Sequence, residues 1–324
     1  MRAVVLTAPG APLTVQDIPE PVAPAGGAVV DVLACGICHS DLHAAAGDYP
    51  TALPVVLGHE VAALHPRLGP VLVYACWGCR KPDCWACGSA QEMICPDATE
   101  AGLFRDGGYA ERIAVPSEEY LVPLGDLDPA HAAPLACGGL TAYRAVDHTL
   151  PVLAASRRPR ALVVGAGGLG QFGLQWLRIR SDAEVTVVDA SAEKRALALS
   201  LGAHAVTAPG EVEGTFTAVI DFVGAEATLA TARDHVARQG MVVVVGLYGG
   251  SIPFGFGAVP HEAHFLTSVW GSLAQMHEMV ALAQQHPLHS PIEVVGLDDV
   301  ATAHERLHRG EVSGRFVITP GGHA

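Results

Sequence analysis

The chain has 324 residues, and its 19 lysines and arginines against 33 aspartates and glutamates give a net charge of −14. Such an acidic chain is a poor match for nucleic acid, because phosphate backbones are bound by clustered Lys and Arg. Half of the residues are hydrophobic and only 16% are charged, which excludes a mainly disordered chain. This length predicts about two domains, each with its own core.

Signals for export or membrane insertion are weak. Residues 1–7 include no apolar run long enough for a signal peptide. The longest uncharged run, residues 240–260, is interrupted by six glycines and two prolines. A membrane-spanning helix needs about 20 mostly apolar residues, so this run is expected to form strands and turns. We therefore expect a cytoplasmic protein without a membrane partner.

The first 137 residues predict a mostly β domain. Proline and glycine separate short apolar runs such as residues 28–33 and 71–74, a pattern typical of strands and turns. All eight cysteines lie in this part of the chain. Cysteines clustered in a cytosolic protein indicate metal binding more often than a disulfide framework.

One cysteine group is compact. Cys79, Cys84, Cys87 and Cys95 follow the spacing C-x4-C-x2-C-x7-C. Four thiolates this close in sequence can close tetrahedrally on one zinc ion, and with no ligand position left for water such a site is structural. The alternatives are free thiols or a disulfide pair, and Cys76 could replace Cys79 as the first ligand.

A second group is dispersed and consists of Cys38, His59 and Cys137. Three protein ligands that leave a fourth position open are typical of a catalytic zinc site. Each residue alone also has an ordinary interpretation, because a buried cysteine often acts as a small hydrophobic residue. The spacing by itself leaves both interpretations open.

The next segment predicts a nucleotide-binding turn. An apolar strand over residues 160–164 leads into Gly165, Gly167 and Gly170 in the pattern G-x-G-x-x-G, and a helical pattern follows. The first glycine allows a tight turn, the second lets the backbone approach a pyrophosphate, and the third lets helix and strand pack closely. The helix N-terminus then offers N–H groups to phosphate.

An acidic residue follows at the expected distance. Asp189 ends a second apolar strand, residues 184–188, and lies 24 residues after Gly165. A carboxylate there accepts hydrogen bonds from the adenosine ribose and repels a 2′-phosphate, which favours NAD over NADP. Lys194 and Arg195 lie nearby and either contact the adenosine end or form a solvated helix face.

Strands and helices continue to alternate. Residues 218–224, 241–246 and 266–271 read as buried strands, with a helix over residues 227–238 between the first two. This alternation predicts a parallel, doubly wound α/β sheet. Ligands bind such sheets at the carboxyl ends of the strands, which makes these residues candidates for the cleft, with structural turns as the alternative for the two glycines: Gly246, Leu247, Trp270 and Gly271. Residues 314–319 predict a further short strand.

Taken together, these motifs resemble the zinc-containing medium-chain alcohol dehydrogenases. Two shorter stretches, WGC at 77–79 and DFVGAEAT at 221–228, are most similar to the bacterial enzymes that accept secondary alcohols. The stretches that match the family are GICHSDLH at 36–43, LGHE at 57–60, the cysteine lobe at 79–95, DGGYAE at 106–111, PLACGGLTAY at 134–143, VVGAGGLG at 163–170 and GRFVI at 314–318.

The resemblance implies roles for individual residues. Cys38, His59 and Cys137 match the catalytic zinc ligands, Glu60 matches the acid beside that zinc, and Asp41 matches the carboxylate that orients the zinc histidine. Ser40 and His43 match the proton relay, and Cys79, Cys84, Cys87 and Cys95 match the structural zinc lobe. The expected cofactor contacts are His39, Gly165, Gly167, Gly168, Leu169, Gly170, Asp189, Lys194, Gly246, Leu247, Trp270, Gly271 and Arg315.

The implied fold has two domains. A mostly β, GroES-like catalytic domain is expected over residues 1–143 and 273–324, with the structural zinc lobe at 76–95. A Rossmann NAD-binding domain is expected over residues 144–272. The implied activity is reversible, NAD-linked oxidation of an alcohol to a ketone or aldehyde by hydride transfer. Small or aromatic secondary alcohols are the expected substrates, with primary alcohols and aldehydes as the alternative. Two zinc ions per chain and a homodimer or homotetramer are expected.

The sequence departs from the family pattern in three ways. Two extra residues separate Cys79 from Cys84, and the segments 58–77 and 203–216 are short. Cys137 also stands where the secondary-alcohol enzymes often have aspartate. Two other functions therefore remain as alternatives: a zinc-free quinone or enoyl reductase of the same superfamily, and a non-catalytic NADH-binding redox sensor.

Overall fold

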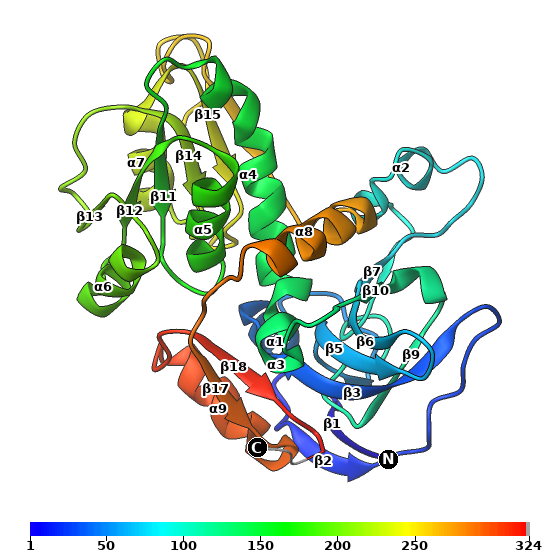
Figure 1. The fold of residues 1–324 in the computed structure, drawn as a ribbon. Coiled ribbons are helices and arrows are strands. Elements are labelled where there is room, and N and C mark those ends of the chain that lie inside the picture. Colours follow the sequence, from blue (N-terminus) through cyan, green and yellow to red (C-terminus); the bar gives the residue numbers. More distant parts are fainter. Residues whose placement is uncertain (322–324) are drawn as a thin grey trace. The chain divides into compact units, whose positions relative to one another are not determined.

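A computed structural model describes residues 1–321. The chain forms two compact units, one made of Met1–Leu140 and the residues from Gly271 onward, and the other of Thr141–Trp270. Figure 1 shows the chain coloured from the N-terminus to the C-terminus. The expected domain limits at residues 143 and 273 stay a prediction.

The first unit is built mainly of antiparallel strands. Its largest sheet has the order β10-β6-β5-β3-β18-β17, and β9 pairs with β3. A second sheet has the order β2-β1-β4, and β7 pairs with β8. The strands are β1 (Arg2–Leu6), β2 (Thr14–Asp17), β3 (Ala28–Gly36), β4 (Val55–Val56), β5 (Glu60–His65), β6 (Gly69–Val73), β7 (Cys76–Trp77), β8 (Thr99–Glu100), β9 (Arg112–Val115), β10 (Leu121–Pro123), β17 (Ile292–Val295) and β18 (Arg315–Ile318).

Helices in the first unit are short, apart from one. The longest is α8 (Leu273–Gln285), whose N-cap Ser272 accepts a hydrogen bond from the N–H of Gln275 at 3.1 Å. The remaining helices are α1 (His39–Ala46), α2 (Trp85–Gly88), η1 (Glu92–Ile94), η2 (Glu118–Tyr120), α3 (Pro129–Ala132), η3 (Ala133–Ala136), η4 (Leu297–Asp299) and α9 (Val300–His308).

The short segment between Gly58 and Trp77 forms a complete hairpin. β5 and β6 pair from Ala62 opposite Leu72 to His65 opposite Gly69, so three residues connect them. The central strands of the sheet are therefore present although this segment is short.

The second unit contains one parallel sheet of six strands in the order β13-β12-β11-β14-β15-β16. This order places the first strand beside the fourth, as in doubly wound nucleotide-binding sheets, and the predicted α/β sheet is confirmed. The strands are β11 (Arg160–Val164), β12 (Glu184–Val188), β13 (Ala205–Thr207), β14 (Phe216–Asp221), β15 (Val236–Val244) and β16 (His264–Thr267). The helices are α4 (Gly138–Ala155), α5 (Gly170–Arg180), α6 (Ala192–Ser200) and α7 (Glu226–His235).

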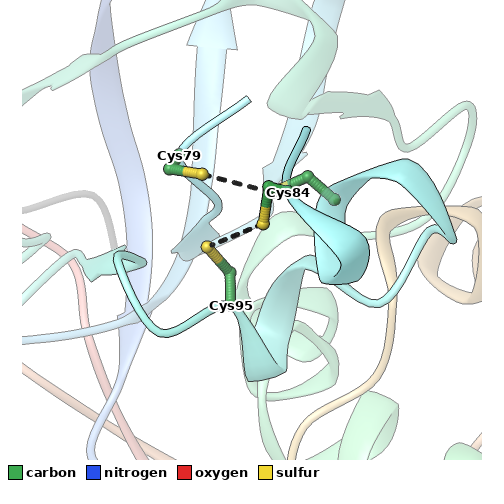
Figure 2. A group of neighbouring side chains, drawn as sticks. Cys79, Cys84 and Cys95 are labelled. Carbon is green, nitrogen blue, oxygen red and sulfur yellow. Dashed lines mark hydrogen bonds between the residues drawn. The ribbon is translucent and has the colours of Figure 1, made fainter. Parts of the chain in front are cut away.

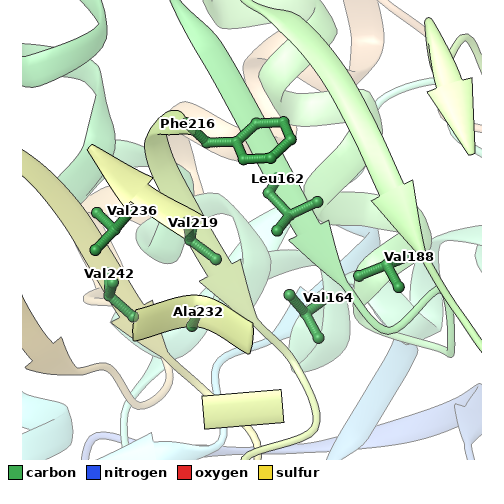
Figure 3. Packing of buried hydrophobic residues seen from close by; sticks show 8 residues of the cluster. All are labelled: Leu162, Val164, Val188, Phe216, Val219, Ala232, Val236 and Val242. Atoms are coloured by element: carbon green, nitrogen blue, oxygen red, sulfur yellow. The ribbon is translucent and has the colours of Figure 1, made fainter. Parts of the chain in front are cut away.

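The core of this sheet consists of β-branched and other apolar residues (Figure 3). β-Branched side chains suit a strand that is buried on both faces, because they pack well on a pleated surface. The cluster contains Leu162, Val164, Val188, Phe216, Val219, Ala232, Val236 and Val242.

Two predicted element limits were wrong. The helix expected over residues 227–238 ends at His235, and Val236 begins strand β15, where it pairs with Phe216. The strand expected over residues 266–271 spans His264–Thr267 instead, and Trp270 has a positive φ of 49°. In the first place pairing in the sheet outweighed the local pattern, and in the second the pairing with β15 ends at Thr267, opposite Val244. Within residues 1–321, no helix combines the length and the apolar character needed to cross a membrane.

Candidate functional site

Among residues 1–321, two groups of side chains could hold a metal ion, and both lie in the first unit. The first group combines Cys38, His59, Glu60 and Cys137, which offer ligand atoms within 4.8 Å of one another. All four residues are buried. The structure thus brings together the three dispersed residues of the second predicted group and adds the Glu60 carboxylate.

The pairing of two strands brings this group together. β3 and β5 are antiparallel, with Gly36 opposite Glu60, so that Cys38 follows the end of β3 where His59 precedes β5. A side chain at Gly36 would collide with the Glu60 carboxylate, so glycine is needed there. Cys137 lies between η3 and α4, one residue before the start of α4.

The Asp41 carboxylate holds His59. Asp41 is almost fully buried, and its Oδ1 lies 3.2 Å from Nδ1 of His59. The same carboxylate accepts the N–H of Cys38 at 2.8 Å and the N–H of Gly58 at 3.3 Å. A carboxylate on Nδ1 fixes the imidazole tautomer and leaves Nε2 as the ligand nitrogen. This geometry suits the orienting role expected of Asp41.

The ionisable side chains of this group have pKa values shifted in different directions. A hydrogen bond from Cys137 lowers the pKa of Cys38 well below its usual value, and the same bond together with burial raises the pKa of Cys137. Burial alone would lower the pKa of His59, but the nearby Asp41 and Cys38 outweigh it and raise that pKa. A divalent cation bound here would displace the protons that Cys137 and His59 retain.

Glu60 is held by two partners. Its Oε1 accepts the N–H of Gly138 at 3.2 Å, and its Oε2 forms an ion pair with the guanidinium of Arg315, which is also buried. Burial raises the pKa of Glu60 to about 7, against the opposing charge of Arg315. The Nε of Arg315 is buried and has no hydrogen-bond partner among the described residues.

This donor set fits zinc. Two thiols and one imidazole are ligands that zinc prefers, and three such ligands leave a position open for another group. The burial of all four side chains and the orienting carboxylate behind His59 match what a zinc site requires.

The expected proton relay lies on α1 beside this group. The sulfur of Cys38 lies 3.8 Å from the Oγ of Ser40. His43 is partly exposed, and its Nδ1 lies 2.8 Å from a carboxylate oxygen of Asp48 while its ring packs against Tyr49. His39, the first residue of α1, is exposed.

The second group consists of the four lobe cysteines. The sulfurs of Cys79 and Cys87 lie 3.9 Å apart, and those of Cys84 and Cys95 lie 3.7 Å apart. Figure 2 shows Cys79, Cys84 and Cys95 with their sulfur atoms turned toward one another. All four sulfurs lie within 4.8 Å of one another, and Cys76, buried in β7, is in neither of the groups found in the described part of the chain.

Four thiols at these distances fit a closed tetrahedral zinc site. The segment between Cys79 and Cys84, two residues longer than in the family pattern, forms a loop in which Arg80 has a positive φ of 56°. The longer spacing still brings the sulfurs together. No disulfide links the cysteines, all of which lie in the described part of the chain.

The glycine-rich turn of the second unit follows β11. Gly165 has a φ of 87°, which favours glycine, and a side chain at Gly170 would collide with the carbonyl of Gly165. A Cβ on Gly167 would meet no atom within 4 Å, so the backbone is accessible there. Gly168 and Leu169 complete the turn, and Gly170 begins α5. Gly165 and Gly170 therefore have a steric reason at their positions.

Asp189 lies beside this turn at the end of β12. Its Oδ2 accepts the N–H of Ala166 at 2.8 Å, and its Oδ1 accepts the N–H of Ser191 at 2.8 Å. Arg195 donates to the backbone carbonyl of Asp189 at 2.7 Å. Lys194 lies in the first turn of α6, where its N–H donates to Ser191.

The remaining expected cofactor contacts lie at the ends of strands. Gly246 follows β15, and a side chain there would collide with the backbone of Val223 and Gly224, which gives this glycine a packing reason. Leu247 is 61% exposed, whereas Trp270 is buried.

Two residues near Asp41, Tyr109 and His304, were not predicted as individual site residues. The hydroxyl of Tyr109 donates to Asp41 at 2.9 Å and lies 3.1 Å from Nε2 of His304 on α9. Tyr109 occurs in the DGGYAE stretch, which gave no sign of its partner. His304 had no sequence signal, because it lies 195 residues from Tyr109.

Comparisons with known proteins agree with these observations. Residues 24–126 match the alcohol dehydrogenase GroES-like domain, and residues 168–285 match the zinc-binding dehydrogenase domain. An alcohol dehydrogenase of Geobacillus stearothermophilus is 31% identical, with 98% of each chain covered, and an NAD-dependent alcohol dehydrogenase of Sulfolobus acidocaldarius is 32% identical, with 98% of this chain and 99% of the relative covered.

A solved structure agrees as well. The alcohol dehydrogenase of Aeropyrum pernix superimposes with a TM-score of 0.88 at 30% identity, over 99% of this chain and 100% of that chain. The predicted combination of a GroES-like domain and a Rossmann domain is confirmed by these matches. The chain belongs to the zinc-containing medium-chain alcohol dehydrogenase family.

Proposed function

We propose that this chain is a zinc-dependent, NAD-linked alcohol dehydrogenase that interconverts alcohols with ketones or aldehydes. One observation carries the proposal: two buried thiols and a buried imidazole lie within 4.8 Å of one another, with a carboxylate fixing the imidazole from behind. Zinc bound there supplies a Lewis acid that makes an alcohol hydroxyl easier to deprotonate, and NAD supplies the hydride acceptor.

In the proposed site, Cys38, His59 and Cys137 hold the zinc ion, and Asp41 orients His59. Glu60 keeps a carboxylate beside the ligands, where Arg315 and the N–H of Gly138 fix its position. Cys79, Cys84, Cys87 and Cys95 hold a second zinc ion that stabilises the lobe.

Ser40 and His43 are the proposed proton relay. The closeness of Ser40 to the Cys38 sulfur supports the first step, in which Ser40 takes the hydroxyl proton of the substrate. His43, which is exposed enough to exchange with water, then accepts that proton. The contact between Asp48 and Nδ1 of His43 holds the imidazole ring in one orientation.

NAD is the proposed cofactor. The close packing at Gly165 and Gly170 and the Asp189 carboxylate beside the turn support it. The unpaired Nε of Arg315 suits an anion such as the cofactor pyrophosphate. The other proposed contacts are His39, Gly167, Gly168, Leu169, Lys194, Gly246, Leu247, Trp270 and Gly271.

We further propose secondary alcohols as substrates and a homodimer or homotetramer as the assembly. Strand β16 ends the parallel sheet, and its other edge could pair with a second copy of the chain. Phe254 and Phe256, in the loop before β16, are exposed apolar side chains that such an interface would cover. A cytoplasmic location is proposed because thiol-based zinc sites persist where thiols stay reduced. Light scattering of the zinc-loaded protein tests the assembly, and the monomer mass of 33.5 kDa would contradict it.

The decisive experiment measures zinc per chain and NADH formation with a panel of primary and secondary alcohols. The wild-type protein should contain two zinc ions and reduce NAD. Cys38→Ala should keep one zinc ion and lose at least about a thousandfold in kcat/KM, because the metal contributes several kcal/mol. Cys35→Ala is the matched control, since Cys35 is equally buried but lies outside both metal-binding groups.

Cys35→Ala should keep two zinc ions and near-normal activity. A wild-type protein that binds NADH but contains no zinc would reject the proposed function and favour the zinc-free reductase or the non-catalytic sensor. Full activity and two zinc ions in Cys38→Ala would reject the ligand assignment.

A further inference from the structure

The hydrogen bonds around Asp41 saturate its carboxylate. Oδ1 lies 3.2 Å from Nδ1 of His59 and accepts the N–H of Gly58 at 3.3 Å. Oδ2 accepts the N–H of Cys38 at 2.8 Å and the hydroxyl of Tyr109 at 2.9 Å. A carboxylate has about four lone-pair positions, and donors occupy all of them here. The carboxylate plane, which directs His59, is therefore defined by four contacts.

Two side chains contact the Asp41 carboxylate, and Tyr109 is the one that is not a proposed metal ligand. Its ring is fully buried, and it packs against Gly58, where a side chain would collide with the ring. Burial and the nearby Asp41 carboxylate raise the pKa of Tyr109 well above its usual value. The hydroxyl therefore stays protonated and acts as a donor to Asp41.

His304, on helix α9, contacts the Tyr109 hydroxyl. Its Nε2 lies 3.1 Å from the Tyr109 hydroxyl, and the two rings meet edge to face with centroids 5.7 Å apart. Tyr109 has one hydroxyl proton and gives it to Asp41, so the phenol oxygen must accept from His304. His304 consequently carries its proton on Nε2. The side chain is 6% exposed, which makes this a buried and directional contact.

We propose that Tyr109 and His304 are positioning residues for the catalytic metal site: the path from His304 through Tyr109 to Asp41 fixes the orientation of the His59 imidazole. This inference rests on the proposed function, because it concerns the zinc ligand His59. This chain of hydrogen bonds links His59, which precedes strand β5, to helix α9, which packs against α1. Partners behind a metal-ligating histidine typically alter metal affinity or activity by about 10–100-fold when they are removed.

The test measures zinc release to a chromophoric chelator, alongside the visible spectrum of the cobalt-substituted protein and the steady-state kinetics. Cys38→Ala identifies the release phase that belongs to the catalytic site, and the lobe zinc serves as the internal reference. Tyr109→Phe removes one hydroxyl and keeps the ring. His304→Leu removes the donor, whereas His304→Gln keeps an N–H at a similar reach.

Tyr109→Phe should release the catalytic metal about tenfold faster, shift the cobalt bands and lower kcat more than it raises KM. His304→Leu should change all three readouts in the same direction, and His304→Gln should restore near wild-type values. The control is Tyr74→Phe, which removes an equally buried hydroxyl that donates to the carbonyl of Gly271 at 2.8 Å, away from Asp41. It should leave the catalytic release phase unchanged.

The outcomes separate the two proposals. If the wild-type protein has no metal in the Cys38 site, the proposed function fails. If it has that metal but Tyr109→Phe matches it in release rate and cobalt spectrum, the positioning inference alone is overturned. Equal effects of His304→Leu and His304→Gln would remove His304 from the path, and equal effects of Tyr109→Phe and Tyr74→Phe would reduce Tyr109 to a structural role.

Discussion

The backbone N–H of Ala166 donates to the Asp189 carboxylate at 2.8 Å. This bond ties the glycine-rich turn after β11 to the acidic residue at the end of β12, two features that are 23 residues apart in the chain. The N–H of Ser191 holds the other carboxylate oxygen at 2.8 Å. The negative charge is therefore held beside the turn, where a dinucleotide in a sheet of this topology places its adenosine ribose.

Replacing this charge should change the cofactor preference. Asp189→Asn should weaken NADH binding by about 10–100-fold, because hydrogen bonds to a charged group contribute about 1.5–3 kcal/mol. Binding of NADPH should weaken less or improve, since the repulsion of its 2′-phosphate is removed. Fluorescence titration with both cofactors measures the ratio. Asp182→Asn, an exposed aspartate before β12, is the control and should leave the ratio unchanged. An unchanged ratio in Asp189→Asn would contradict the assignment.

The lobe cysteines give a second prediction. Cys79→Ser should reduce the zinc content from two ions to one and lower the thermal midpoint, because a structural zinc site contributes directly to folding stability. Cys76→Ala should keep both zinc ions, since Cys76 lies outside the group of four. Elemental analysis of both variants decides between the two cysteines. Loss of one zinc ion in Cys76→Ala, with none lost in Cys79→Ser, would reverse the assignment.

Gly58 gives a prediction about stability. Its φ is 95°, and a side chain there would collide with the Tyr109 ring and lie 2.8 Å from the Cys35 sulfur. Gly58→Ala should therefore reduce the free energy of unfolding by about 2–5 kcal/mol, the combined cost of a left-handed backbone and an overpacked core. Urea titration of the zinc-loaded protein measures this loss.

Gly69→Ala is the matched control. Gly69 has a similar φ of 74°, but a methyl group added there would have open space around it, with no atom within 4 Å. The substitution should cost about 1–2 kcal/mol, from the backbone alone. Equal losses in the two variants would show that packing around Tyr109 plays no part in the need for glycine at position 58.

His148 gives a prediction about pH. Burial on α4, together with the charge of Arg144, lowers the pKa of His148 from its ordinary value of 6.5. The unfolded chain therefore binds a proton at a higher pH than the folded chain does, and stability falls as the pH decreases through about 6.5. His148→Gln should lose less stability than the wild type between about pH 7.5 and pH 5.5, as measured by thermal midpoints. An exposed control, His277→Gln, should follow the wild-type slope. Parallel slopes for His148→Gln and the wild type would contradict the prediction.

The two candidate metal sites differ in how far the sequence could define them. The lobe cysteines lie within 17 residues, so local spacing was enough to predict a group, although it left Cys76 and Cys79 as rivals. Cys38, His59 and Cys137 are far apart in sequence. Cys38 and His59 meet because β3 and β5 pair in one register, and Cys137 joins them because η3 packs against both strands. Spacing does not encode these long-range contacts.

The ends of the helices and strands were likewise predicted only in part from the local sequence pattern. The alternation of apolar strands and helices was enough to predict the parallel sheet of residues 160–267, because burial on both faces demands continuous β-branched runs. It did not locate the end of α7 at His235, because Val236 is drawn into β15 by its pairing with Phe216. Local preference is weak where a buried strand competes for the same residue.

By itself, the sequence determined the class of chemistry in this protein: the thiols and imidazole that suit zinc, the glycines that suit a dinucleotide turn, and the acidic residue that suits a ribose. The lobe thiols, the glycines and the acidic residue follow from residue types and short spacings, whereas Cys38, His59 and Cys137 were assigned by their match to the family pattern. Only the tertiary structure decided which groups support them. Tyr109 lies 68 residues from Asp41, and His304 lies 195 residues from Tyr109, yet the three are joined by hydrogen bonds. Such contacts form when distant strands and helices pack into one core, and no local pattern records them.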